Sequence, residues 1–125
     1  MQNLILVFVG GGIGSIVRFA MNRWVSSLHA LNFPVGTLVV NFIACALLGY
    51  FVGLADHKQM LSASARLFWV AGFCGGFSTF SAFTLETLAL FQGGFTISAL
   101  GYIGLSVTLC LGSMLGGLYA GGAYS

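Results

Sequence analysis

The stretch Gly72-Phe-Cys-Gly-Gly-Phe-Ser-Thr-Phe-Ser-Ala-Phe-Thr-Leu-Glu-Thr87 decides how this chain folds. It lies in an apolar context long enough to cross a bilayer, yet Gly72, Gly75 and Gly76 weaken a helix there. Backbone groups left unpaired in hydrocarbon cost several kcal/mol each, so a helix breaks at that depth only where the freed groups face protein, a cavity or an ion. We therefore expect the helix to be interrupted around Gly75 to Thr79 and to form a site.

The composition around this stretch is that of an integral membrane protein. The chain has 125 residues, of which 58% are hydrophobic and 5% charged, whereas soluble domains carry about 25% charged residues. There is no basic run of the kind that binds nucleic acid, so no nucleic-acid partner is expected. With one glutamate, one aspartate and no serine beside a base, the chain also lacks a catalytic set, which argues against an enzyme.

The apolar segments predict an all-α membrane protein with four transmembrane helices in contact with lipid. The expected spans cover about residues 4–22, 35–54, 66–90 and 96–119, so residues 1–125 form a single four-helix transmembrane domain. Small-residue spacings at Gly10 and Gly14, at Gly112 and Gly116, and at Gly117 and Gly121 predict faces where helices approach closely.

The cations beside the spans are evenly divided between the two sides of the membrane. Arg18 and Arg23 flank one side, and Lys58 and Arg66 flank the other. Because the bias of loop cations sets orientation, this balance allows the chain to insert both ways. We expect two oppositely oriented copies to pair as an antiparallel, dual-topology homodimer.

Polar side chains inside the spans suit a small anion. Neutral hydroxyl and amide hydrogens replace part of an anion's hydration without the deep trap that a buried Lys or Arg creates, and phenyl edges add weak positive potential. Core packing or lipid contact is the alternative for the phenylalanines, and an interhelical packing bond is the alternative for Asn41. The candidate pathway residues are Asn41, Phe80, Ser81, Phe83, Thr84 and Ser106.

An interrupted helix also releases backbone carbonyls, whose partial negative charge suits a small cation. The alternative is a structural kink whose carbonyls are satisfied by neighbouring hydroxyls. The three cysteines, Cys45, Cys74 and Cys110, show no paired spacing, and we interpret them as small buried hydrophobic residues.

Three motifs resemble the CrcB/Fluc family of microbial fluoride channels over essentially the whole chain. They are GGIGSIVRF at residues 11–19, GTLVVN at 36–41 and GFCGGFSTFSAF at 72–83, of which the third is highly specific. The resemblance implies an antiparallel homodimer with two conduits and a structural sodium ion, held by the backbone carbonyls of Gly75 and Ser78 from each copy. It also implies that Phe80 and Phe83 line the pore and that Asn41 and polar groups of span four line the route.

The chain departs from the family pattern at two positions. Ser78 stands where a threonine is common, which a backbone ligand tolerates, and Ala82 stands where a hydroxyl is common. A polar contact from position 82 is therefore not expected. Arg18 is either a helix-end residue or a group that draws anions into the vestibule. For Glu86 we expect an interfacial cap or an ion pair with the partner chain, and proton transfer is the alternative.

These observations lead to a functional hypothesis. We expect a passive fluoride-selective channel in the bacterial cytoplasmic (inner) membrane, which exports fluoride and relieves its toxicity. The alternative is a proton-coupled small multidrug-type exporter, which resembles this chain in length and span number. Such exporters place an essential carboxylate in span one, and this chain has no acidic residue there.

Overall fold

The computed structural model describes residues 1–28 and 33–122, and the described residues are helical without any strand. Four helices are long and apolar enough to cross a membrane, and each contains one of the expected spans. This confirms an all-helical, multi-pass membrane protein. The four helical segments are Gln2–Ser27, Val35–Asp56, Ala63–Gln92 and Thr96–Ala120.

The four segments divide into shorter elements. The first is α1 (Gln2–Ser27), and the second is α2 (Val35–Val52) followed by the π-helical turn η1 (Gly53–His57). The third consists of α3 (Ala63–Arg66), the π-helical η2 (Leu67–Cys74), α4 (Gly75–Phe77) and α5 (Phe80–Gln92). The fourth is α6 (Thr96–Ala120).

Local sequence explains where several helices begin. Pro34 precedes α2, where a residue without an N–H group loses no helical bond. The Ser62 hydroxyl caps α3 by accepting a bond of 3.1 Å from the N–H of Ala65. Gly94, with φ of +83°, forms the turn between α5 and α6, a conformation that glycine adopts at low cost. Arg66 in α3 forms an ion pair with Asp56 of η1 across the other connection.

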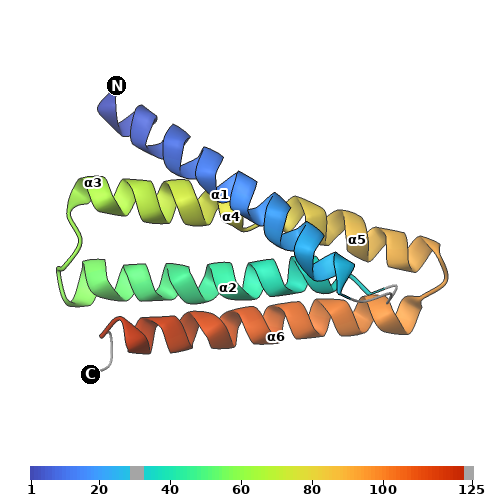
Figure 1. Cartoon of the computed structure of the whole chain (residues 1–125). Helices are drawn as coiled ribbons and strands as arrows, with labels where there is room; N and C mark the ends of the chain where they lie inside the picture. Colours follow the sequence, from blue (N-terminus) through green and yellow to red (C-terminus); the bar gives the residue numbers. More distant parts are fainter. Residues whose placement is uncertain (29–32, 123–125) are drawn as a thin grey trace.

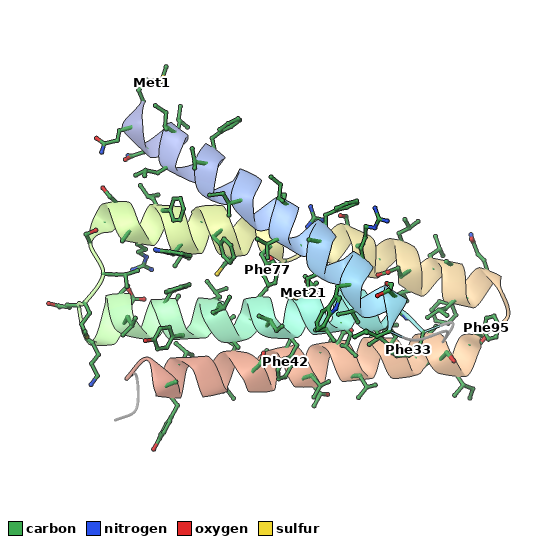
Figure 2. All side chains as sticks on the ribbon, in the orientation of Figure 1. Met1, Met21, Phe33, Phe42, Phe77 and Phe95 are labelled. Atoms are coloured by element: carbon green, nitrogen blue, oxygen red, sulfur yellow. The ribbon has the colours of Figure 1, made fainter. Side chains whose placement is uncertain are left out.

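The helices alternate in direction and pack as a bundle. In Figure 1, α2 and α6 lie side by side, the elements α3 to α5 run along the other side of α2, and α1 crosses them at an angle near α4. One buried cluster joins Val40 and Ala44 of α2 to Phe77 of α4, with Met21 of α1 packed against it (Figure 2). This cluster surrounds the end of α4, and a second one joins Leu90 of α5 to Ala99 and Tyr102 of α6.

Glycine faces allow two of these close contacts. A Cβ atom added at Gly14 would lie against Phe73 O of η2 and 2.9 Å from Phe77 N. Gly117 of α6 and Gly121, the residue that follows this helix, are similarly close to the backbone of α2 and η1, so these two small-residue faces are confirmed. Gly112 and Gly116 make no such contact within this chain, because an added Cβ would meet no described atom within 4 Å at either position.

A substitution pair tests the packing of α1. Gly14→Ala should destabilise the protein by about 1–3 kcal/mol, since the added methyl group meets backbone that cannot move aside. Gly12→Ala on the same helix is the matched control, because its methyl group meets no described atom within 4 Å and alanine favours helix. The measurement is thermal unfolding in detergent, and equal unfolding temperatures for the two variants would contradict the packing described.

Candidate functional site

The third segment leaves helical geometry at two residues only. Helix α4 ends at Phe77, and Ser78 (φ −79°, ψ 155°) and Thr79 (φ −148°, ψ 117°) are extended before α5 begins at Phe80. The sequence predicted an earlier start, at Gly75. The glycines are helical, and Gly76 instead allows close approach of α1, since an added Cβ would lie against Gly11 O.

The hydroxyls of Ser78 and Thr79 account for this position. Ser78 Oγ donates to Cys74 O at 2.9 Å, and Thr79 Oγ1 accepts from the N–H of Ala82 at 3.1 Å. Such local bonds from Ser and Thr compete with helical hydrogen bonds and favour helix starts. Thr79 is thus the N-cap of α5.

The interruption removes carbonyl groups from the helical ladder, among them those of Gly75 and Ser78. In a continuous helix Gly75 O would accept from Thr79 N–H, and Ser78 O would accept from Ala82 N–H. The N–H of Thr79 instead donates to Asn41 Oδ1 at 2.8 Å, and that of Ala82 goes to the Thr79 hydroxyl. The carbonyls of Gly75 and Ser78 have therefore lost their usual donors, as an oxygen-ligated cation site requires.

The carbonyl of Gly76, which lies between these two, is bound by α1. It accepts from Arg18 Nε at 3.1 Å and lies 3.5 Å from the donor Ser15 Oγ. Arg18 is half-buried and also lines a small cavity of about 120 Å³ with Thr37 and Thr79. The guanidinium group therefore contacts the interruption itself.

Asn41 of α2 holds the extended segment from the other side. Its Nδ2 donates to Thr79 O at 2.9 Å, while its Oδ1 accepts from the N–H of the same residue. These two bonds to the backbone of Thr79 fix both the Asn41 side chain and the extended segment. Only one of the two amide hydrogens is needed for this pairing.

An open pocket of about 280 Å³, which we call the Asn41 cavity, lies beside the interruption and brings together four of the predicted pathway residues: Asn41, Phe80, Phe83 and Ser106. It is also lined by Cys45, Ser78, Thr79, Val107 and Cys110, so none of the described residues that line it is charged. The Phe80 and Phe83 rings are 5.5 Å apart between centroids, and Phe83 is 5.1 Å from Tyr102.

The other two predicted pathway residues lie on the exposed side of α5. Thr84 Oγ1 donates to Phe80 O at 2.9 Å, and Ser81 Oγ lies 3.2 Å from Thr79 Oγ1. Neither residue lines the Asn41 cavity of the single chain. Phe80 is also 77% exposed, so this face of α5 is open.

Comparison with known sequences identifies the group of proteins to which this arrangement belongs. The family described as CrcB-like protein, Camphor Resistance (CrcB), matches residues 5–118 of the chain.

The chain belongs to the CrcB family.

Curated CrcB-type relatives cover nearly the whole chain. A fluoride-specific ion channel FluC of Rhizobium etli is 41% identical over 118 residues, which is 94% of each chain. A protein of the same name from Agrobacterium fabrum is 39% identical over 121 residues, 97% of each chain. The FluC of Leptospira interrogans is 35% identical over 118 residues, 94% of this chain and 93% of its own. These relatives are ion channels by name and not enzymes.

In this CrcB chain the structure adds a polar group that sequence reasoning missed. Tyr102 of α6 is fully buried, and its hydroxyl donates to Glu86 Oε1 of α5 at 3.2 Å. Thr37 of α2 is close to both, yet its buried hydroxyl has no well-formed hydrogen bond among the described residues. Glu86 therefore accepts a hydrogen bond from its own chain, whereas the sequence predicted an interfacial cap or an ion pair with the partner chain.

Weak sequence signals pointed to this group. Thr37 precedes Asn41 by four residues, and Tyr102 precedes Ser106 by four, so each shares a helix face with a predicted pathway residue. The contact between Tyr102 and Glu86 depends on how α5 packs on α6. Helix packing of this kind is not encoded in local spacing.

Proposed function

We propose that this protein is a passive, fluoride-selective channel. The observation that carries the proposal is the Asn41 cavity, in which uncharged donors and phenyl rings meet at a helix interruption. Membership of a family whose curated relatives are named fluoride-specific ion channels supports the choice of ion.

The chemistry of the cavity suits a small, strongly hydrated anion. The spare amide hydrogen of Asn41 and the hydroxyl of Ser106 donate to fluoride, and the edges of Phe80 and Phe83 add weak positive potential. Conduction requires binding that is strong enough to replace water and weak enough to release the ion. A path of neutral donors meets both conditions, whereas a buried ammonium would retain the anion.

The proposed functional unit is an antiparallel homodimer whose helix interruptions lie at mid-membrane. The apolar outer face of α5, with Phe80 exposed, is open to a second copy, which would also cover Ser81 and Thr84. Where two such copies meet, the released carbonyls of Gly75 and Ser78 from each would hold a structural sodium ion. The positive charge of that ion would attract the carbonyls of both copies and hold the two interruptions next to each other.

The alternative, a proton-coupled small multidrug-type exporter, has less support. Such a mechanism needs a carboxylate in α1, and Gln2–Ser27 contains no acidic residue. Glu86 of α5, which accepts a bond from Tyr102, does not line the Asn41 cavity.

Proteoliposome efflux tests the proposed function. We expect vesicles that contain the purified protein to release fluoride much faster than chloride, with no pH gradient applied. Protein-free vesicles are the control for leak. Chloride efflux as fast as fluoride efflux, or movement that requires a proton gradient, would contradict the proposal.

A charge-bias experiment tests the antiparallel assembly. Ser26→Lys with Ser27→Lys adds two cations at the end of α1, and Gln59→Lys with Met60→Lys adds two at the opposite end of the bundle. Each double variant expressed alone should insert in one orientation and lose most fluoride resistance in cells. Co-expression of the two should restore it, whereas full resistance from either variant alone would contradict dual topology.

The proposed location is the bacterial cytoplasmic membrane. Hydrogen fluoride enters cells from acidic surroundings and releases fluoride inside, where the charged ion cannot recross lipid unaided. A passive channel allows this fluoride to leave down its gradient.

A further inference from the structure

Two cysteines on neighbouring helices meet at the wall of the Asn41 cavity. Cys45 of α2 and Cys110 of α6 both line it, and both are partly exposed. The sequence predicted three small buried cysteines without paired spacing; all three are free, but only Cys74, at 3% exposure, is buried.

Each of the two cysteines lies one helical turn beyond a predicted pathway donor. Cys45 lies four residues after Asn41 on α2, and Cys110 lies four residues after Ser106 on α6. Residues at this spacing share a helix face, one turn apart. The thiols therefore lie one turn further along the wall of the same cavity than Asn41 and Ser106.

The helices that carry the thiols are held close together. A Cβ atom added at Gly49 would lie 2.9 Å from Leu118 N, and one added at Gly117 would lie 2.8 Å from Tyr50 N. Helix backbones in such contact cannot move apart without losing the packing of α2 on α6. The two cysteines therefore lie on helices that the fold holds together at the same wall of the Asn41 cavity.

Two thiolates without further ligands select a particular class of metal ion. Thiolate is a soft ligand that prefers Cu(I) and similar thiophilic ions to Na⁺, Mg²⁺ or Ca²⁺. Structural zinc usually takes four protein ligands, and the described residues contain no group of three or more His, Cys, Asp or Glu side chains that could hold a metal. The ions that bind two sulfur atoms in a linear arrangement are Cu(I), Ag(I) and Hg(II).

We propose that Cys45 and Cys110 form a two-thiol site for a soft metal cation, whose binding closes the anion route. With Hg²⁺ as the probe, two sulfur–mercury bonds form and two thiol protons pass to water, so no oxidant is needed. The bound metal fills space beside Asn41 and Ser106 and cross-links α2 to α6. Closure of the route rests on the proposed channel function, whereas metal binding does not.

Fluoride efflux in the presence of micromolar Hg²⁺ and an excess of a monothiol competitor tests closure. We expect the efflux of the unmodified protein and of Cys74→Ala, the matched control, to fall by about tenfold or more and to recover after addition of a dithiol chelator. Cys45→Ala and Cys110→Ala should each keep at least about half of their own metal-free rate. The proposal would be overturned if Hg²⁺ inhibited either of these variants as strongly as the unmodified protein, or if it failed to inhibit Cys74→Ala.

Metal binding in detergent tests the site independently of conduction. In excess monothiol competitor, the unmodified protein and Cys74→Ala should retain one Hg²⁺ per chain and lose two titratable thiols. Cys45→Ala and Cys110→Ala should retain none, because a single thiol does not compete with excess monothiol. Retention of Hg²⁺ by either single variant would overturn the site, even if the protein conducted no fluoride.

Discussion

Phe83→Ile should lower fluoride efflux by about a hundredfold or more, which would be one of the two largest effects of a single substitution in this protein. The Phe83 ring lies between Phe80 and Tyr102, with centroid distances of 5.5 Å and 5.1 Å, and lines the Asn41 cavity. Isoleucine retains apolar bulk but has no ring edge to present to an anion. Initial efflux rates from proteoliposomes provide the measurement.

Phe91→Ile is the matched control for this substitution. Phe91 lies on the same helix, α5, is 39% exposed and does not line the Asn41 cavity. Its replacement should leave the efflux rate within about twofold of the unmodified protein. If Phe83→Ile conducted normally and eluted as a folded protein, the rings would serve packing alone.

Asn41→Asp should stop conduction for two reasons that act together. The substitution replaces the amide group that donates to Thr79 O at 2.9 Å with an oxygen that repels it, which costs about 1–3 kcal/mol. It also places a negative charge beside the route of an anion. We expect the efflux rate at neutral pH to fall by about a hundredfold or more.

Asn41→Ala separates these two effects. Alanine removes both bonds to Thr79 without adding charge, so it should weaken the interruption yet conduct better than the aspartate variant. Efflux and thermal unfolding of both variants would be measured together. Equal efflux from the two variants would restrict Asn41 to a structural role.

Much of the fold could be predicted from the sequence because membrane spans are encoded locally. About 20 apolar residues in a row are enough to indicate a spanning helix, and Gly10 and Gly14 indicated a close helix contact that the structure contains. The spacing at Gly112 and Gly116 looked the same and makes no such contact in this chain. Spacing alone does not reveal which face of a helix meets a neighbour.

The site was predictable where a single segment carries it and not where several helices meet. The motif of residues 72–83 indicated an interruption, but glycine content placed its start too early. Local hydroxyl bonds from Ser78 and Thr79 determine the actual position. The bond of Tyr102 to Glu86, and the meeting of Cys45 and Cys110 at one cavity wall, join residues that are 16 and more positions apart, so no local pattern predicts them.

The most direct test of passive fluoride conduction is the reversal potential of the current across a planar bilayer that contains the purified protein. With a fluoride gradient, equal chloride and a pH difference between the two sides, we expect the current to reverse at the equilibrium potential of fluoride. Changing the pH difference should leave this potential unchanged. A reversal potential that followed the chloride or the proton gradient would contradict a passive fluoride channel.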